Sequence, residues 1–417
     1  MSETTTCAII GGGPAGMMLG LLLSRAGVHV TVLEKHADFL RDFRGDTVHP
    51  TTAGLLDELG LGERFAALPQ SRVERLTAGL GEGRQLTLAD FTRLRVDHPY
   101  IAMVPQWDLL NVLAEAGADE PAFDLRMSTE ATGLLHENGR VAGVRYTGPE
   151  GPGELRADLT VACDGRGSMV RGTSGLTVRE YPVTFDAWWF RVPVRGRPVP
   201  ALIPRAGLGR LIIPIPRDGY LQMALMGRKG TDAELRERGI EALRREVVEL
   251  MPELADTIGG LASMDDVKHL DVRVDRLRRW HTEGLLCIGD AAHAMSPIAG
   301  VGINLAVQDA VAAARLLAEP LRSGRATGRR LDAVRRRRLL PTVATQTLQR
   351  ILHKRVVGPI LAGRRPTAPK PLLSAVRALP QLSAVPAYLI GVGVRPERAP
   401  AFGRRDVRAA AGDRPGT

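Results

Sequence analysis

Three glycines near the N-terminus are spaced as in turns that bring a protein backbone close to a pyrophosphate. Gly11, Gly13 and Gly16 follow a short apolar run, residues 7–10, which is typical of a buried parallel strand. In such a turn the first glycine permits the tight bend, the second gives the phosphates room, and the third lets helix and strand pack closely. We expect the phosphates at the N-terminus of a helix predicted over residues 15–26, where free N–H groups and the helix dipole favour anions.

An acidic residue completes the pattern. Gly27 is expected to end the helix, residues 28–33 predict a second strand, and Glu34 then stands 18 residues beyond Gly16. At that separation an acidic side chain accepts hydrogen bonds from the adenosine ribose of a dinucleotide. The glycine triplet alone is a weak signal because tight turns are common. The strand, turn, helix, second strand and terminal acid together predict a dinucleotide site.

Two later stretches repeat the order of apolar strand and polar turn. Asp164 and Gly165 follow one predicted strand, and Gly289 and Asp290 follow another. The strands before the three turns also hold the cysteines, which are Cys7, Cys163 and Cys287. We interpret the cysteines as small buried hydrophobic residues in preference to metal ligands or redox groups.

A further glycine-rich loop opens a long alanine-rich helix. Pro297 precedes Gly300 and Gly302, and the helix is expected to run from there through Asn304 to Pro320, which should end it. The N-terminus of this helix would stabilise a negative charge beside the loop through the helix dipole.

Taken together, these motifs resemble those of the flavin-dependent aromatic hydroxylases that have the para-hydroxybenzoate hydroxylase fold. The resemblance covers roughly residues 7–355. Its most specific marker is the run from Gly289 to Asn304. The other markers are the turn at residues 11–16, the run 164–171 and the segments 42–52 and 104–110.

The resemblance implies FAD, bound without a covalent link, and a set of residues that contact it. It implies that Arg44 and Gln106 contact FAD, that Asp290 binds the ribityl chain, and that the turn of Asp164 and Gly165 serves both FAD and nicotinamide. The predicted cofactor contacts are Gly11, Gly13, Ala15, Gly16, Glu34, Lys35, Arg44, Gln106, Asp164, Gly165, Gly289, Asp290, Pro297, Gly300, Gly302 and Asn304. No metal site is predicted.

The resemblance also implies a reaction in which the flavin carries the chemistry and the protein supplies placement and excludes water. NAD(P)H would reduce FAD as a transient co-substrate. O2 would then add to give a flavin C4a-hydroperoxide, and a hydroxyl group would pass to an aromatic or polyketide-like small molecule. No second glycine fingerprint follows a later strand, and members of the resembled family likewise lack a separate NAD(P)H domain. Because the flavin carries the chemistry, we assign no catalytic side chain. His293 follows the ribityl-binding aspartate in the resembled family, where it is usually structural, so it receives no proton-transfer role.

The order of elements predicts an α/β fold, in which a Rossmann-like FAD-binding domain carries an inserted antiparallel β-sheet domain and a C-terminal helical segment. The predicted boundaries are residues 1–75, 100–180 and 270–340 for the FAD-binding domain, 76–99 and 181–269 for the substrate domain, and 341–417 for the C-terminal region.

The inserted segment is rich in aromatic side chains that could form an apolar pocket. Trp188, Trp189, Phe190 and Tyr220 belong to it, with Arg191 as a nearby basic residue. Because neighbours on a strand alternate faces, Trp189 shares a side with Arg191, and Trp188 and Phe190 lie on the other. The predicted substrate contacts are Arg191, Trp189 and Pro297. Arg191 would orient an anionic or phenolate group of the substrate.

Composition argues against several other classes of protein. The chain has 417 residues, 44% of them hydrophobic and 24% charged, as in globular proteins with a large core. The net charge of +10 comes from residues 321–417, which carry 21 basic and 4 acidic side chains. Arginine accounts for 51 of the 56 basic residues, and few aromatic residues are interleaved with them, so we expect no nucleic-acid partner. The consecutive residues Arg335 to Arg338 point in four directions around a helix, which we expect to be mostly solvated.

No signal peptide is recognised, and the cytoplasm is the expected compartment. The apolar stretch 372–391 contains Arg377, Pro380 and Pro386, so no transmembrane segment is predicted. Weak contact with a membrane surface stays open because the flanks of this stretch are basic. No oligomeric state is predicted.

Other activities of the same cofactor fold stay open. Baeyer–Villiger oxygenation and epoxidation would use the same intermediate, and the apolar C-terminus suggests a prenyl-lipid reductase. A non-catalytic, flavin-bound redox sensor would also keep the cofactor motifs. A halogenase is disfavoured, because such enzymes need a pocket lysine and a Trp-x-Trp-x-Ile-Pro segment. No lysine occurs between residues 36 and 228, and residues 188–193 have a different spacing.

Overall fold

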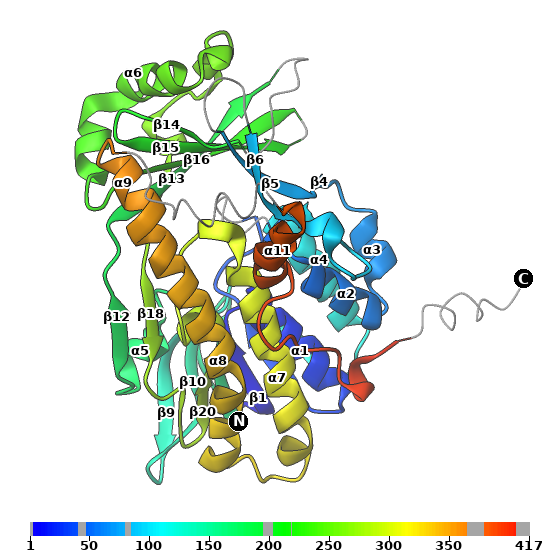
Figure 1. Cartoon of the computed structure of the whole chain (residues 1–417). Coiled ribbons are helices and arrows are strands. Elements are labelled where there is room, and N and C mark those ends of the chain that lie inside the picture. The colour runs from blue at the N-terminus through cyan, green and yellow to red at the C-terminus, as the bar shows by residue number, and fades with distance from the viewer. Residues whose placement is uncertain are drawn as a thin grey trace, which may run out of the picture.

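The computed structural model describes residues 3–40, 47–79, 85–194, 203–217, 219–364 and 379–405. Its largest sheet has eight strands, of which five neighbours run parallel in the order β20-β11-β1-β2-β8 (Figure 1). β19 pairs antiparallel with β20, and β9 and β10 extend the first half of β11. The strands are β1 (Glu3–Ile10), β2 (Val30–Leu33), β8 (Phe123–Arg126), β9 (Glu130–Glu137), β10 (Arg140–Gly148), β11 (Gly151–Ala162), β19 (His281–Thr282) and β20 (Leu285–Cys287).

Long helices pack on this sheet and bury one continuous apolar core with it. They are α1 (Pro14–Arg25), α4 (Gln106–Ala118), α7 (Gly302–Arg322) and α8 (Gly328–Leu352). α1 packs against α4 and α7, and α7 packs against α8. By length and composition α7, with the turn before it, could cross a membrane, but 83% of its apolar window lies buried inside the protein. Its apolar surface is therefore used for packing in the core.

The end of α7 differs from the prediction. The helix continues through Pro320 to Arg322, so the expected stop at Pro320 is wrong. A proline inside a helix removes one backbone hydrogen bond. Pro320 and Leu321 are both buried here, and their packing against the core compensates for that loss.

A second sheet of five antiparallel strands lies at one end of the first (Figure 1). Its order is β14-β15-β16-β13-β17. The strands are β13 (Phe185–Pro193), β14 (Arg205–Gly207), β15 (Arg210–Arg217), β16 (Tyr220–Arg228) and β17 (Lys268–Leu270), and α6 (Asp232–Leu250) covers one face. Trp188 and Phe190 belong to the apolar cluster beneath α6, and the Trp188 indole N–H donates to Asp232 Oδ1 at 2.7 Å. The face opposite α6 therefore carries Trp189 and Arg191.

Smaller elements complete the α/β fold. A three-stranded sheet contains β3 (Thr47–Val48), β4 (Ser71–Val73) and β7 (Ile101–Met103), and a hairpin contains β5 (Arg75–Gly79) and β6 (Gln85–Asp90). β12 (Val178–Tyr181) pairs with β18 (Val274–Leu277). The short helices are α2 (Pro50–Glu58), α3 (Gly62–Ala66), α5 (Met169–Thr173), α9 (Gly358–Leu361) and α11 (Ala384–Gly391).

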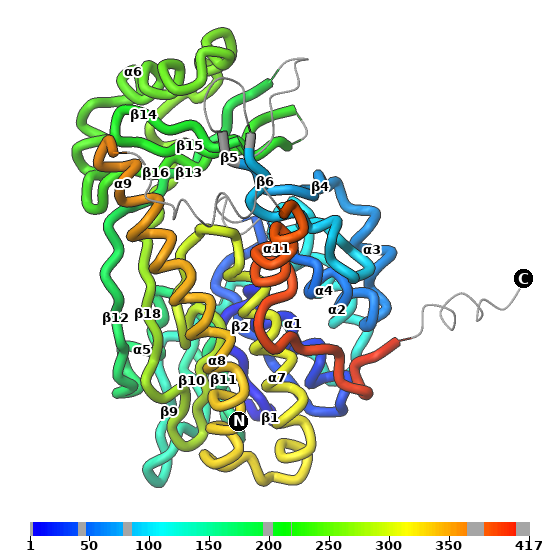
Figure 2. The backbone as a smooth tube through the Cα atoms, viewed as in Figure 1, coloured from blue at the N-terminus to red at the C-terminus, as the bar shows by residue number. Residues whose placement is uncertain are grey.

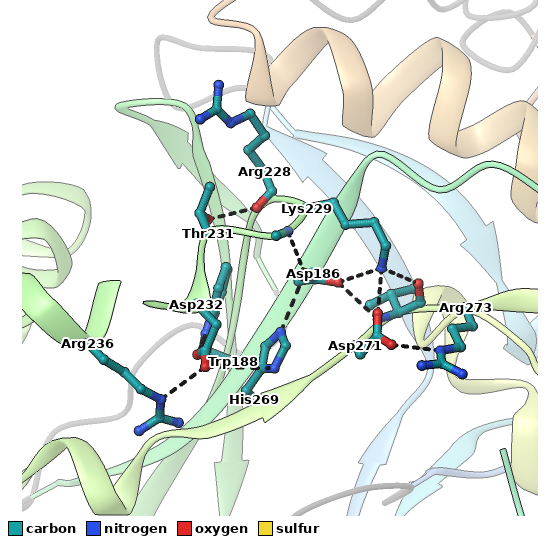
Figure 3. A network of polar contacts seen from close by, with 12 residues as sticks. Asp186, Trp188, Arg228, Lys229, Thr231, Asp232, Arg236, His269, Asp271 and Arg273 are labelled. Atoms are coloured by element: carbon teal, nitrogen blue, oxygen red, sulfur yellow. Dashed lines mark hydrogen bonds and ion pairs between the residues drawn. The ribbon is translucent and has the colours of Figure 1, made fainter. Parts of the chain in front are cut away.

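A buried carboxylate holds the second sheet to the segment that leads from β17 to β18 (Figure 3). Asp186 on β13 accepts hydrogen bonds from Lys229 Nζ at 2.9 Å, Gly230 N at 2.9 Å and Val272 N at 3.1 Å. Lys229 also donates to Asp271 Oδ1 at 2.6 Å. Burial by itself raises the pKa of Asp186, but these donors outweigh burial and lower the pKa below its usual value.

We predict that Asp186→Asn lowers the free energy of unfolding by about 1.5–3 kcal/mol at pH 7, because charge-assisted hydrogen bonds in a buried site are lost. Since the folded-state pKa of Asp186 is lowered, the stabilisation is present above the unfolded pKa of about 3.9 and is lost as the pH falls below it. Urea unfolding at neutral and acidic pH measures this difference. Asp265→Asn, at an exposed carboxylate, is the control, and equal losses in both variants would contradict the assignment.

Candidate functional site

The three polar turns follow adjacent parallel strands, so the fold brings them together at one edge of the main sheet. The Gly11 N–H donates to Leu33 O at 2.8 Å, and Cys163 N–H donates to Ile10 O at 2.8 Å. The strand before the third turn continues the row, with Ile288 N–H donating to Ala162 O at 3.1 Å. Ligands of open α/β sheets bind at this carboxyl edge of parallel strands.

The glycines of the first turn meet different constraints. Gly11 has φ +98°, and a Cβ there would lie 2.7 Å from Cys163 O. A Cβ on Gly16 would lie 2.0 Å from Gly11 O, whereas nothing lies within 4 Å of one on Gly13. Gly13 is also the N-cap of α1 and offers no side-chain cap to the free N–H groups of that helix. The protein backbone therefore needs Gly11 and Gly16, and the space beside Gly13 is open.

Glu34 closes the first turn from the end of β2. Its side chain is buried, with 1% of the residue exposed. Oε2 accepts from Gly12 N–H at 2.8 Å and Oε1 accepts from His36 N–H at 3.0 Å. Lys35 beside it is exposed. Both oxygens of the Glu34 carboxylate thus orient backbone around the turn.

The second and third turns are joined by an arginine that sequence reasoning missed. Arg166 Nη2 donates to Asp290 Oδ2 at 3.0 Å, and Arg171 Nη1 donates to Asp290 O at 3.4 Å. Asp164 Oδ1 and Arg166 Nη1 are buried and have no hydrogen-bond partner among the described residues. Burial raises the pKa of Asp164. Buried polar atoms without partners call for a polar ligand or ordered water. The signal in the sequence was a cation placed directly after the turn of Asp164 and Gly165.

The glycine-rich loop before α7 has a conformation that its neighbours impose. Ala299 and Gly300 have φ of +66° and +60°, and a Cβ on Gly300 would lie 2.3 Å from Thr47 Oγ1. Gly300 O accepts from Thr47 Oγ1 at 2.7 Å, and His49 Nε2 lies 3.1 Å from the same oxygen. A positive φ at alanine costs energy and persists where surrounding contacts hold it. Gly302 then opens α7, whose N-terminus has no side-chain cap.

The other predicted cofactor contacts occupy different surroundings. Ala15 packs close to Gly289, since a Cβ on Gly289 would lie 3.3 Å from Ala15 Cβ. Asn304 is buried and accepts a hydrogen bond from Thr52 Oγ1. Gln106 is half-buried at the first position of α4. Arg44 lies outside the residues that the structure describes.

A buried ion pair supports the third turn from behind. Asp309 on α7 is 0% exposed, and its Oδ2 accepts from Gly289 N–H at 3.1 Å and lies 2.6 Å from His293 Nε2. Arg338 Nε donates to Asp309 Oδ1 at 2.9 Å. Burial by itself raises the pKa of Asp309, but His293 and Arg338 lower it overall. The signal that was missed is Asp309 itself, the single charged residue of α7 between residues 302 and 314.

The prediction that the four arginines lie on a mostly solvated helix is wrong for Arg338, which is 1% exposed. Arg335 and Arg336 pair with Asp332, and Arg337 pairs with Glu397. Because successive positions are about 100° apart around α8, a helix that packs on the core must turn some member of such a run inward.

On the second sheet, Arg191 faces α4. Its guanidinium carbon lies 6.0 Å from the centre of the Trp107 ring and 4.9 Å from that of Tyr220. Trp189 belongs to an apolar cluster that includes Ile298, the neighbour of Pro297. The Trp189 indole N–H is buried without an acceptor among the described residues. These side chains place aromatic surface and two kinds of donor on the side of the sheet that faces away from α6.

Comparisons with known proteins agree with this arrangement. A family model described as an FAD binding domain matches residues 3–350. A 6-methylpretetramide 4-monooxygenase of Streptomyces rimosus is 35% identical over 385 residues, which cover 88% of this chain and 88% of that protein. A 12-dehydrotetracycline 5-monooxygenase/anhydrotetracycline 6-monooxygenase of Streptomyces rimosus subsp. rimosus is 32% identical over 324 residues, which cover 73% of this chain and 60% of that protein. Among solved structures, an anhydrotetracycline hydroxylase from Streptomyces rimosus has the same fold, with a TM-score of 0.75 and 24% identity over 94% of this chain and 76% of that chain.

We predict that Arg338→Gln lowers the free energy of unfolding by about 3 kcal/mol or more, because it leaves the buried Asp309 carboxylate without its cation. Arg336→Gln removes the same charge from the same run, but the Arg336 side chain is 62% exposed, so its loss should stay within about 0.5 kcal/mol. Urea unfolding of both variants measures the difference, and equal midpoints would show that the buried pair does not stabilise the fold.

Proposed function

We propose that this chain hydroxylates a polyketide-like aromatic molecule with NAD(P)H and O2. The chain belongs to the FAD-binding-domain family and is an FAD-dependent aromatic monooxygenase. The observation that carries the substrate proposal is the 35% identity to a 6-methylpretetramide 4-monooxygenase over 88% of both chains. When bound, FAD supplies the redox chemistry for O2 activation, which protein side chains lack.

The site fits a dinucleotide in two respects that do not depend on the motif. The N-termini of α1 and α7 have no side-chain cap, so their free N–H groups can bind anions. The space beside Gly13 is open, whereas the flanking glycines are packed. We therefore assign the pyrophosphate to the N-terminus of α1, beside Gly11, Gly13, Ala15 and Gly16.

The remaining cofactor contacts are proposed from the sequence resemblance. Glu34 would accept hydrogen bonds from the adenosine ribose, with Lys35 at the exposed rim. Asp290, oriented by Arg166, would accept hydrogen bonds from the ribityl hydroxyls. The other proposed contacts are Arg44, Gln106, Asp164, Gly165, Gly289, Pro297, Gly300, Gly302 and Asn304.

Substrate would lie between the second sheet and the loop before α7. The buried Trp189 indole N–H has no acceptor among the described residues. It therefore favours a ligand that presents an oxygen atom there, because an unpaired buried donor costs free energy. Arg191 would orient a phenolate or other anionic group. Pro297 would contact the substrate from the loop. The apolar cluster around Trp189 would exclude water from the reacting atoms.

We also propose the reductant, the cellular compartment and the division into domains. NAD(P)H is proposed as a transient reductant, because the sequence contains one glycine fingerprint. The cytoplasm is proposed as the compartment, since Cys7, Cys163 and Cys287 are free thiols. The predicted division into FAD-binding, substrate and C-terminal regions is also a proposal. It is supported by the separation of the eight-stranded sheet from the five-stranded sheet, although α8 continues across the predicted boundary between residues 340 and 341.

We predict that Gly13→Ala weakens FAD binding without unfolding the protein, because a methyl group would enter the open space beside the turn and φ of −78° suits alanine. Gly16→Ala should instead lower stability by about 1–3 kcal/mol, since its Cβ would overlap Gly11 O. Fluorescence titration of the apoprotein with FAD and thermal unfolding separate the two effects. Unchanged FAD affinity in folded Gly13→Ala protein would remove Gly13 from the site.

We predict that Arg191→Ala raises the KM for a phenolic substrate about tenfold or more, the loss of one charge-assisted contact, and leaves FAD content unchanged. The substrate is identified first, by screening polyketide-like phenols for those that accelerate NAD(P)H oxidation. Mass spectrometry of the product then checks that one oxygen atom has been added. Arg210→Ala, at an arginine of the same sheet that contacts Trp188 beneath α6, is the matched control. An unchanged KM in Arg191→Ala would contradict the anchoring proposal. It would not affect the proposed FAD chemistry, which is tested separately by the reduction of bound FAD with NAD(P)H.

A further inference from the structure

The described C-terminal residues lie against the elements that form the cofactor edge. Figure 2 shows the tube running from α11 alongside α7 and then turning away from it. Ile390 packs on a small apolar cluster of Met295, Val301 and Leu305, which belong to the loop and first turn of α7. The Glu397 N–H donates to the side chain of Gln308, also on α7. The C-terminal segment is thus attached along α7 and does not lie free on the surface.

Glu397 is the charged centre of this attachment. It is 2% exposed, and Arg337 on α8 donates to both of its carboxylate oxygens, at 2.6 and 2.7 Å. Arg315 Nε on α7 lies 3.7 Å from Oε2, and Arg338 Nη1 lies 3.8 Å from Oε1. One carboxylate from the C-terminal segment therefore faces three guanidinium groups on two core helices.

Arg338 connects Glu397 to the third turn of the site. Its Nη1 also donates to Arg395 O at 3.3 Å, while its Nε donates to Asp309 Oδ1. Asp309 in turn accepts from Gly289 N–H at 3.1 Å. The path from Glu397 to Gly289 thus consists of two buried carboxylates with a buried guanidinium between them.

A second path leads from the same segment to the loop before α7. His49 Nδ1 lies 2.8 Å from Ile390 O, and its Nε2 lies 3.1 Å from Gly300 O. Thr51 Oγ1 donates to Gly391 O and Val392 O, at 2.9 and 3.0 Å. The C-terminal segment is therefore connected both to the turn of Gly289 and Asp290 and to the loop before α7.

We infer that Glu397 is a positioning residue, which acts through Arg338 and Asp309 to hold the Gly289–Asp290 turn in the conformation that binds FAD. This inference rests on the proposed cofactor site. With Glu397 neutralised, Arg337 and Arg315 reach solvent, whereas buried Arg338 loses its second acidic neighbour. Asp309 then holds the Gly289 N–H less firmly, because its own main cation has shifted.

The test is the dissociation constant of FAD for the apoprotein, measured by fluorescence titration in parallel with the thermal midpoint of the apoprotein. Glu397→Gln, which keeps the side-chain shape, should weaken FAD binding by at least about fivefold. Asp309→Asn should do the same. The double variant should lose less than the product of the two single effects, because residues of one network are not additive. Arg336→Gln, at the exposed member of the arginine run, should leave the constant unchanged.

Each outcome bears on the inference. A lower thermal midpoint for Glu397→Gln with an unchanged FAD constant would overturn it, because a purely structural role predicts that result. Fully multiplicative single effects would overturn the path through Arg338. If Glu397→Gln fails to fold, Arg337→Gln replaces it, since that change removes the bidentate partner at a half-exposed site and should weaken FAD binding in the same direction. A wild-type apoprotein that does not bind FAD would instead overturn the proposed cofactor site.

Discussion

A carboxylate that is fully removed from water must be neutralised inside the protein, and Asp309 imposes this requirement on three parts of the fold at once. It takes a backbone N–H from the turn after β20, a ring nitrogen from His293 and a guanidinium from α8. Arg338 would be as costly to bury alone as Asp309. The two charges are stable only when α7, α8 and the turn are assembled together, so the turn that carries Asp290 is held by the core and not by its own loop.

The parallel sheet supplies the second constraint, because the ends of neighbouring strands meet at one edge. Residues as far apart as Gly11, Asp164 and Gly289 become neighbours through three backbone hydrogen bonds between β2, β1, β11 and β20. Within that edge, folding and binding requirements fall on different residues of one motif. Gly11 and Gly16 are glycines because the backbone passes too closely for a side chain, and Gly13 leaves space that the protein itself does not use.

The second sheet uses its two faces for different purposes. Trp188 and Phe190 fill the core beneath α6, which makes β13 a stable central strand. Trp189 and Arg191, at the alternating positions, face the side of α4 and the loop before α7. A strand with one buried face is therefore a rigid support for the side chains on its other face, and rigid support is what orientation of a substrate requires.

The sequence by itself determined the fold class, the family and the order of turns along the main sheet, and the comparisons confirm the family. These features depend on local patterns, since strand periodicity, glycine spacing and an acid at a fixed separation each act over a few residues. The inward turn of Arg338, the continuation of α7 past Pro320 and the link from Arg166 to Asp290 were decided only by tertiary structure. A run of four arginines is the same in a solvated and in a packed helix, and only the packing of α8 on α7 selects which of them meets Asp309. The connection of Glu397 to the turn at Gly289 likewise joins residues more than a hundred positions apart, and no local pattern contains the buried charges that make such a connection necessary.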